Sequence, residues 1–246
     1  MMRTILIDDE SLARDIVKHY LSSFPDIEVV AECSDGFEGL KAITQHQPDF
    51  IFLDIQMPKI NGFEMLELVE KPPAVIFTTA FDEYAIKAFE VNAVDYLLKP
   101  IEQSRFEQAI QKLPGRLNSG DNSATQELLD SAALSPAQNN RVVVKTNGVI
   151  KIISVNDIHY LEADDDYVKL STTEGVFHKN KTMSFFERTL DPGQFIRIHR
   201  SYIINLAQVT KIELKEKDNY IVLLKSDIWL PVSKTGYVKL KAALGM

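Results

Sequence analysis

The first half of the chain alternates short apolar runs with segments that repeat apolar residues at helical spacing. Five runs, rich in β-branched or aromatic residues, have the length of buried strands in a parallel sheet. They are Thr4–Ile7, Val29–Ala31, Phe50–Leu53, Val75–Phe77 and Tyr96–Leu98. The segments between them space apolar residues three or four positions apart. Five such units predict a doubly wound α/β (flavodoxin-like) domain over residues 1–117, whose ligands bind outside the carboxyl ends of the strands.

The pattern changes after Arg141, where many short β-prone runs are separated by turn residues. The clearest runs are Val142–Lys145, Ile150–Ile153, Tyr167–Ser171, Phe195–Ile198, Val209–Leu214 and Tyr220–Leu224. Helical spacing is confined to two patches, 184–190 and 236–244, and Trp229 is expected in the core. Residues 118–140, rich in Ser, Asn, Gly and Ala, are typical of a linker. We therefore expect a second, mostly-β domain over residues 141–246.

Composition fits an ordinary globular protein, since 45% of the 246 residues are hydrophobic and 25% are charged. No apolar run is long enough to cross a bilayer, and Asp8 and Asp9 interrupt the first apolar stretch where a signal peptide would continue it. Cys33 is the only cysteine, which excludes an internal disulfide and a cysteine-based zinc site. We expect a cytoplasmic protein without membrane association. The net charge of −8 is concentrated in the first half, so the mildly basic second half is the better candidate for binding a polyanion.

Acidic side chains gather at the expected carboxyl ends of two strands. Asp8 and Asp9 follow the first strand, and Asp54 ends the third. Three carboxylates in one crevice repel one another unless a cation lies among them, and an oxygen-only cluster suits Mg²⁺. Thr79 adds a hydroxyl at the end of the fourth strand, and Lys99 adds an ammonium group at the end of the fifth.

This set of groups describes a site for a phosphoryl group. A carboxylate attacks phosphorus, a metal neutralises the oxygens, and Lys and Thr hold the remaining phosphoryl oxygens. Asp54 is the best nucleophile, because Pro58 and Gly62 shape the following loop so that its carboxylate stays open. The alternative is that these are turn-capping aspartates and a solvated lysine. Five such groups at four strand ends favour the functional interpretation.

In the second half, alternation in FIRIHRSYI places Arg197 and His199 on one face of a strand, and Arg200 follows. Such a strand suits contact with DNA phosphates and guanine edges, although a solvated outer face gives the same pattern. Other basic candidates are Lys179, Lys181 and, just before the last helical patch, Lys234. Helix-turn-helix and zinc-finger spacings are absent, which leaves a β scaffold with reading loops.

Four motifs of the first half, ILIDDE, FIFLDIQMPKINGFE, VIFTTA and DYLLKP, resemble the receiver domain of two-component response regulators in order and spacing. The resemblance covers residues 3 to about 117. It implies that Asp54 accepts phosphate from a sensor histidine kinase. It further implies that Mg²⁺ is bound by Asp9, Asp54 and the backbone carbonyl of Gln56, and that Asp8 holds a metal-bound water.

The same resemblance assigns the other groups of the site. Thr79 and Lys99 are implied to sense the phosphoryl group, and Tyr96 to be the aromatic switch that rotates inward. Phosphorylation then promotes a homodimer through the receiver. The segment FDEYAIKAFEVNA, with Tyr84, Ile86 and Phe89, is a candidate dimer face, although such residues are more often core.

Motifs of the second half, DIHYLEADDDYVKL, TMSFFERTL, FIRIHRSYIINL and LPVSKTGYVKLK, resemble the LytTR DNA-binding domain over residues 141–246. The resemblance implies that loops of an elongated β fold enter successive major grooves of direct repeats in promoter DNA. It puts contacts near Asp166 and Tyr167, at His199 and Arg200, and at Lys234. For the acidic run 164–166 a turn-forming role is an equal alternative.

The sequence therefore predicts a phosphorylation-controlled transcriptional regulator that catalyses only its own phosphotransfer and dephosphorylation. One alternative is a Mg²⁺-dependent phosphohydrolase with Asp54 as nucleophile, but such enzymes often carry a second carboxylate two residues later, where this chain has Gln56. The other alternative keeps the receiver and makes the β domain a protein-binding module. Basic residues in its loops argue against that alternative.

Overall fold

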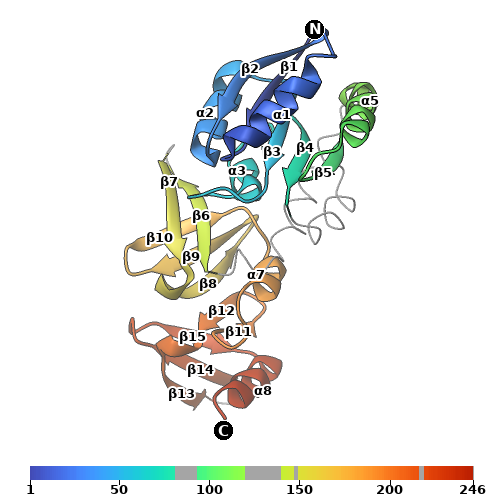
Figure 1. Ribbon diagram of the computed structural model, residues 1–246. Coiled ribbons are helices and arrows are strands. Elements are labelled where there is room, and N and C mark those ends of the chain that lie inside the picture. The colour runs from blue at the N-terminus through green and yellow to red at the C-terminus, as the bar shows by residue number, and fades with distance from the viewer. Residues whose placement is uncertain (81–92, 120–139, 147–148, 216–218, 246) are drawn as a thin grey trace. The chain divides into compact units, whose positions relative to one another are not determined.

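The computed structural model describes residues 1–80, 93–119, 140–146, 149–215 and 219–245 (Figure 1). The chain divides into two compact units, Met1–Ala133 and Leu134–Met246. The candidate dimer face at Tyr84, Ile86 and Phe89 and most of the expected linker lie outside the described residues. Within the part of the chain that is described, no helix has both the length and the apolar character needed to span a membrane.

A five-stranded parallel sheet forms the centre of the first unit. Its strands are β1 (Met2–Ile7), β2 (Ile27–Cys33), β3 (Phe50–Asp54), β4 (Ala74–Thr79) and β5 (Asp95–Leu98), in the order β2-β1-β3-β4-β5. The described helices are α1 (Ser11–Leu21), α2 (Gly36–His46), α3 (Gly62–Glu67) and α5 (Gln103–Ser119). Each predicted apolar run lies within one strand, and the order is that of the flavodoxin-like fold. The α/β prediction is confirmed.

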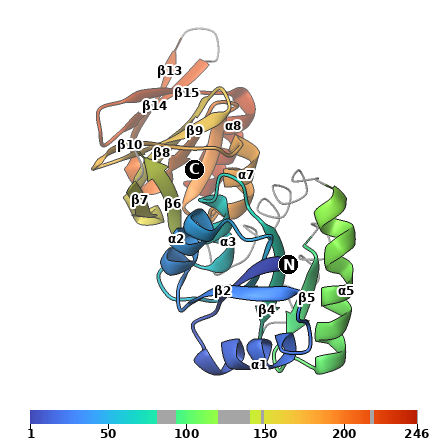
Figure 2. The same cartoon turned by 90° about the horizontal axis from the view of Figure 1, so that it is seen from above.

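Helices cover both faces of this sheet, which explains the nearly continuous apolar character of its strands. On one face α1 and α5 share a core with Leu6 and Phe52, and Phe106 of α5 stacks on Phe52 with ring centroids 5.4 Å apart. On the other face α2 and α3 pack together, and Phe63 of α3 contacts Phe77 of β4. Figure 2 shows the two helix pairs on opposite sides of the sheet. The polar carboxyl ends of the strands are thereby left at one edge.

The loop after β3 is fixed by a capping box and a close backbone approach. Asn61 accepts a hydrogen bond from the N–H of Glu64, whose carboxylate accepts from the N–H of Asn61, so α3 begins at Gly62. A Cβ at Gly62 would lie 2.4 Å from the backbone oxygen of Asp54. Only glycine therefore allows the helix to start this close to the end of β3.

The second unit consists mainly of antiparallel strands. They form a five-stranded sheet (β10-β9-β8-β12-β11), a three-stranded sheet (β13-β14-β15) and the pair β6-β7. The strands are β6 (Arg141–Thr146), β7 (Val149–Ser154), β8 (Ile158–Asp164), β9 (Tyr167–Thr172), β10 (Gly175–Lys179), β11 (Phe195–His199), β12 (Tyr202–Asn205), β13 (Val209–Lys215), β14 (Asn219–Leu224) and β15 (Trp229–Val232). The helices are α7 (Met183–Thr189) and α8 (Lys234–Ala243), close to the two predicted patches, and single 3₁₀ turns follow β7 and β12. The mostly-β prediction is confirmed.

One apolar cluster joins β11, β12, β14, β15 and α8 around Ile198, Val222 and Leu240. Trp229 does not belong to it, because 43% of this residue is exposed on the edge strand β15. The expectation that Trp229 is a core residue was therefore wrong. Its strand alternates, so the neighbouring Leu230 and Val232 face the core instead.

Candidate functional site

The carboxyl ends of the parallel strands bring the predicted acidic, hydroxyl and basic groups to one edge of the first unit. Register aligns Ile7 of β1 with Leu53 of β3, and Asp54 at the end of β3 with Thr78 of β4. Thr79 in turn pairs with Leu98, the residue before Lys99. The backbone N–H of Lys99 donates to the carbonyl of Thr79 at 2.8 Å. Backbone pairing of the strands thus sets the relative positions of residues that are far apart in the sequence, independently of the contacts between their side chains.

The ammonium group of Lys99 lies at the centre of the cluster. Its Nζ is 3.0 Å from carboxylate oxygens of both Asp8 and Asp54 and 3.1 Å from Oε2 of Glu10. The side chains of Asp8 and Asp54 are each only 6% exposed, so these ion pairs are shielded from water, whereas Glu10 is largely exposed. The N–H of Gln56 also donates to Asp54, at 3.2 Å.

The single lysine does not fully compensate the buried carboxylates. Burial, followed by the charge of Asp8, raises the pKa of Asp54 to about 6, and burial also raises the pKa of Asp8. Burial alone lowers the pKa of Lys99, but hydrogen bonds and attraction to Asp8 and Asp54 outweigh it and raise that pKa. The cluster therefore favours a further positive charge, which a divalent cation would supply.

The acidic residues at this edge also fit a metal ion in their geometry. Asp8, Asp9 and Asp54 each offer a carboxylate oxygen, and these oxygens lie within 4.8 Å of one another. Asp8 and Asp54 are buried, while Asp9 is exposed. Carboxylates at a partly open edge, with room for water, are the ligands that Mg²⁺ prefers. The donor set thus fits Mg²⁺.

Thr79 and Tyr96 lie on neighbouring strands beside the cluster. Thr79 is completely buried, and within the described residues no partner is within hydrogen-bonding distance of its Oγ1. A buried hydroxyl without a partner costs free energy, which a bound acceptor would recover. Tyr96 is 5% exposed on β5, next to Phe77 in register.

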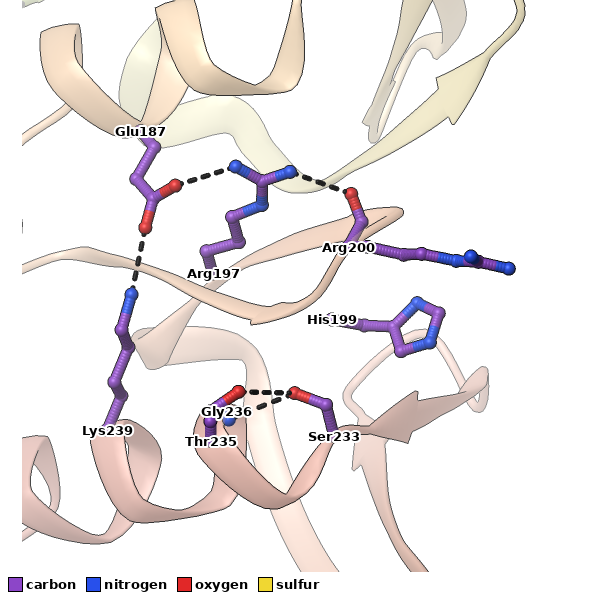
Figure 3. Close-up of a pocket in the computed structure, with 8 residues that line it drawn as sticks. All are labelled: Glu187, Arg197, His199, Arg200, Ser233, Thr235, Gly236 and Lys239. Carbon is purple, nitrogen blue, oxygen red and sulfur yellow. Dashed lines mark hydrogen bonds and ion pairs between the residues drawn. The ribbon is translucent and has the colours of Figure 1, made fainter.

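In the second unit a pocket of about 400 Å³ collects basic side chains from β11, from the turn that follows it and from α8. Its lining residues are Glu187, Arg197, His199, Arg200, Ser233, Thr235, Gly236 and Lys239 (Figure 3). His199 is the last residue of β11, Arg200 lies in the turn between β11 and β12, and Lys239 projects from α8. Three full positive charges against one carboxylate make the pocket suited to an anion.

His199 adds a neutral polar group to this pocket. Burial and then the charge of Arg200 lower the pKa of His199, so the ring is neutral at pH 7. The N–H of Ser201 donates to its Nδ1 at 3.2 Å. With Nδ1 accepting, the neutral ring carries its proton on Nε2, which is then a hydrogen-bond donor.

Comparison with known proteins matches both halves of the chain. The model of the response regulator receiver domain matches residues 4–111, and that of the LytTR DNA-binding domain matches residues 148–245. The chain is 35% identical to the transcriptional regulatory protein BtsR of Escherichia coli over 100% of both chains. It is 32% identical to the sensory transduction protein LytT of Bacillus anthracis over 99% of both. The chain belongs to the LytTR family of response regulators.

Among solved structures, the response regulatory domain of mrkE from Klebsiella pneumoniae is 33% identical, with a TM-score of 0.43, and covers 48% of this chain and 99% of its own. By the two family matches, the LytTR regulator consists of a receiver, which holds the acidic site, and a DNA-binding domain, which holds the basic pocket. It acts in two-component signal transduction and transcription regulation.

Two lysines predicted to contact DNA in this LytTR domain are engaged elsewhere. Lys181 is buried, 7% exposed, and its Nζ lies 4.9 Å from the ring centroid of Phe185. Lys179 donates to the backbone carbonyl of Val143 at 2.7 Å and so ties β10 to β6. They were named as basic candidates in FHKNKTM, but each lies against protein, so neither is proposed as a DNA contact.

Tyr167 is 46% exposed and begins β9 directly after the acidic turn. Asp165 has a left-handed backbone with φ of 50°, and Asp164 forms an ion pair with Lys169 at 3.0 Å. These features support the turn-forming role of the acidic run. Lys234 begins α8, one residue after the N-cap Ser233.

Sequence reasoning missed Lys239 and Glu187 of the pocket. Helical spacing was a usable signal for Lys239, because it lies one turn after Thr235 on the same face of the last helix. Nothing in the sequence pairs Glu187 of α7 with Arg197 of β11, since they meet only through packing between separate elements.

Proposed function

We propose that Asp54 accepts a phosphoryl group from a sensor histidine kinase and that this modification controls DNA binding by the LytTR domain. The observation that carries the proposal is the meeting of Lys99 with Asp8 and Asp54 at 3.0 Å, at the strand ends where Thr79 has a buried hydroxyl with no partner among the described residues. This arrangement offers a nucleophile, a counter-charge and a hydrogen-bond donor within one buried site.

In the proposed reaction a carboxylate oxygen of Asp54 attacks the phosphorus of the kinase's phosphohistidine. The P–O bond forms as the P–N bond breaks, and its electron pair returns to the imidazole of the kinase. Lys99 moves from the carboxylate to a phosphoryl oxygen, and the hydroxyl of Thr79 donates to another. Tyr96 then turns inward as Thr79 is drawn to the phosphoryl group.

Mg²⁺ would be held by Asp9, Asp54 and the backbone carbonyl of Gln56, with Asp8 holding a metal-bound water. When bound, it supplies positive charge that neutralises the carboxylates and the phosphoryl oxygens. The donor set and the raised pKa of Asp54 support this assignment. We propose no turnover of other phosphoesters, because the chain has Gln56 where phosphohydrolases of this kind place a general acid.

For DNA we propose His199, Arg200 and Lys234 as the main contacts, with Tyr167 at a second loop and Lys239 as an added phosphate contact. Double-stranded DNA with direct repeats is the target, and a homodimer formed on phosphorylation is the binding form. The exposure of a basic pocket on the LytTR domain supports this choice of surface. A DNA target places the working protein in the cytoplasm, where bacterial DNA lies.

The test of the phosphoacceptor is labelling by acetyl phosphate with Mg²⁺, followed by intact-protein mass spectrometry. We expect the wild-type chain to gain one phosphoryl group and Asp54→Asn to gain none, because an amide is a far weaker nucleophile than a carboxylate. Asp26→Asn is the matched control, since Asp26 precedes β2 at the opposite edge of the same sheet. Labelling retained by Asp54→Asn would reject the assignment.

A further inference from the structure

One carboxylate in the basic pocket connects three elements of the LytTR domain. Glu187 of α7 accepts from Arg197 of β11 at 2.8 Å through Oε2 and from Lys239 of α8 at 2.9 Å through Oε1 (Figure 3). Its side chain is 33% exposed, and that of Arg197 is 24% exposed. Burial would raise the pKa of Glu187, but the hydrogen bonds from Arg197 and Lys239 outweigh it and lower that pKa. Glu187 is therefore ionised at neutral pH.

Arg197 links Glu187 to the turn after β11, next to the proposed DNA contacts His199 and Arg200. While NH1 pairs with Glu187, NH2 donates to the backbone carbonyl of Arg200 at 3.0 Å. The register of β11 against β12 shifts between Arg197 and His199, so strand pairing alone does not fix the turn. A guanidinium held at both ends supplies the missing restraint.

The same turn is held from its other side by α8. The N–H and the hydroxyl of Ser233 both donate to the carbonyl of Ile198, at 2.8 and 3.0 Å. Gly236 allows this contact, because a Cβ there would lie 1.9 Å from that carbonyl. Residues Ile198–Arg200 are thus clamped between α8 and the Arg197–Glu187 pair.

A carboxylate on a surface that faces DNA repels phosphates and so weakens binding. We therefore ask which structural contribution of Glu187 offsets this repulsion. Glu187 is the one carboxylate among the eight described residues that line the pocket. Its two ion pairs also occupy Arg197, which was predicted from the strand pattern to contact DNA directly. In the structure Arg197 instead connects Glu187 with the backbone carbonyl of Arg200.

We propose that Glu187 is a positioning residue for DNA reading, which acts through Arg197 to hold His199 and Arg200 in their reading geometry. The proposal rests on the proposed DNA contacts of His199 and Arg200. For the preferred sequence, the proposal predicts a change in DNA affinity opposite in sign to the change that charge repulsion alone would give. If Glu187 only repels phosphates, its neutralisation strengthens binding to every duplex. If it positions the turn, neutralisation weakens binding to the preferred sequence only.

The experiment uses the full chain treated with acetyl phosphate and Mg²⁺, a duplex selected by the wild-type chain from a random library, and a scrambled duplex of equal length. For Glu187→Gln we expect the affinity ratio between the selected and scrambled duplexes to fall about tenfold, the scale of one lost base-pair contact. Affinity for the scrambled duplex should stay equal or increase. Glu213→Gln, which removes the same charge from a Glu paired with Lys211 on β13, should keep the ratio.

A double-mutant cycle tests whether the effect passes through Arg197. Arg197→Gln should lower the same ratio, and adding Glu187→Gln to it should cause no further loss. An equal gain on both duplexes for Glu187→Gln would overturn the proposal. So would an equal loss on both together with a lower midpoint of thermal unfolding, which would show a role in folding alone. If the wild-type chain selects no duplex at all, the proposed DNA function fails instead, and the two failures are distinguished.

Discussion

At the scale of single residues, Cys33 shows how position decides reactivity. This only cysteine ends β2 and is 3% exposed. Burial, with the nearby charges of Glu38 and Asp35, raises the pKa of its thiol to about 11. At pH 8 only about one thiol in a thousand is then ionised, and the thiolate is the reactive form.

We therefore expect Cys33 of the folded chain to resist a thiol-specific disulfide reagent at pH 8. The same chain in guanidinium chloride should react promptly with one equivalent, because unfolding exposes the thiol and restores its ordinary pKa. Absorbance of the released thiolate measures both reactions. Fast stoichiometric labelling of the folded chain would contradict the buried position of Cys33.

The residues of the acidic site were predictable, and some of those of the basic surface were not. Asp54, Thr79 and Lys99 were assigned because the carboxyl ends of parallel strands meet at one edge, a property of the backbone. Arg197 was assigned from alternation, which indicates the face of a strand but not what lies across from it, and Lys181 was named only as a basic residue in FHKNKTM. Phe185 and Glu187, which decide their environments, both come from α7.

At the scale of elements, a group of ion pairs around a buried aspartate joins α5 to β5. The side chain of Asp95 at the start of β5 is completely buried and lies 3.0 Å from Arg105 and 2.8 Å from Lys112 of α5. Arg105 also donates to the carbonyl of Tyr96. Burial raises the pKa of Asp95, but hydrogen bonds from Arg105 and Lys112 outweigh it and lower that pKa.

We expect Asp95→Asn to weaken the docking of α5 by roughly 1–3 kcal/mol at pH 7, the size of hydrogen bonds to a charged group. Because the folded pKa lies below the unfolded value of 3.8, the stabilisation is present above pH 3.8 and lost as pH falls through the folded pKa. Amide hydrogen exchange in residues 103–119 should thus differ between variant and wild type at pH 7, and the difference should shrink as the pH falls below 3.8 towards the folded pKa. Asp26→Asn serves as the control, and a difference independent of pH would contradict the ion-pair account.

Element prediction was complete for the parallel strands of the first unit and incomplete for the antiparallel strands of the second. All five parallel strands were identified because burial on both faces makes them apolar throughout. Strand β15 was not, since it contains Pro231, which is tolerated only because β15 is an edge strand. Edge strand β10 was also missed, because its residues are largely exposed and leave little apolar signal.

At the scale of the whole molecule, two units with separate cores need a means of coupling. The composition change after Pro114 was enough to predict two domains, but no pattern within either half encodes how one affects the other. The Ser- and Asn-rich composition of 118–140 is typical of a linker. The homodimer proposed above would supply this coupling, because joining two receivers raises the effective concentration of one LytTR domain near the DNA bound by the other.

This mechanism predicts that the benefit of phosphorylation depends on the number of sites in the DNA. Acetyl phosphate with Mg²⁺ should tighten binding about 100-fold on a duplex with two copies of the selected site, as expected for an intramolecular second contact. On a duplex with one copy the affinity should hardly change. Fluorescence anisotropy at fixed salt measures both, with Asp54→Asn as the control that shows no gain on either. An equal gain on the one-site duplex would instead mean that phosphorylation acts within a single chain, by changing the reading surface itself.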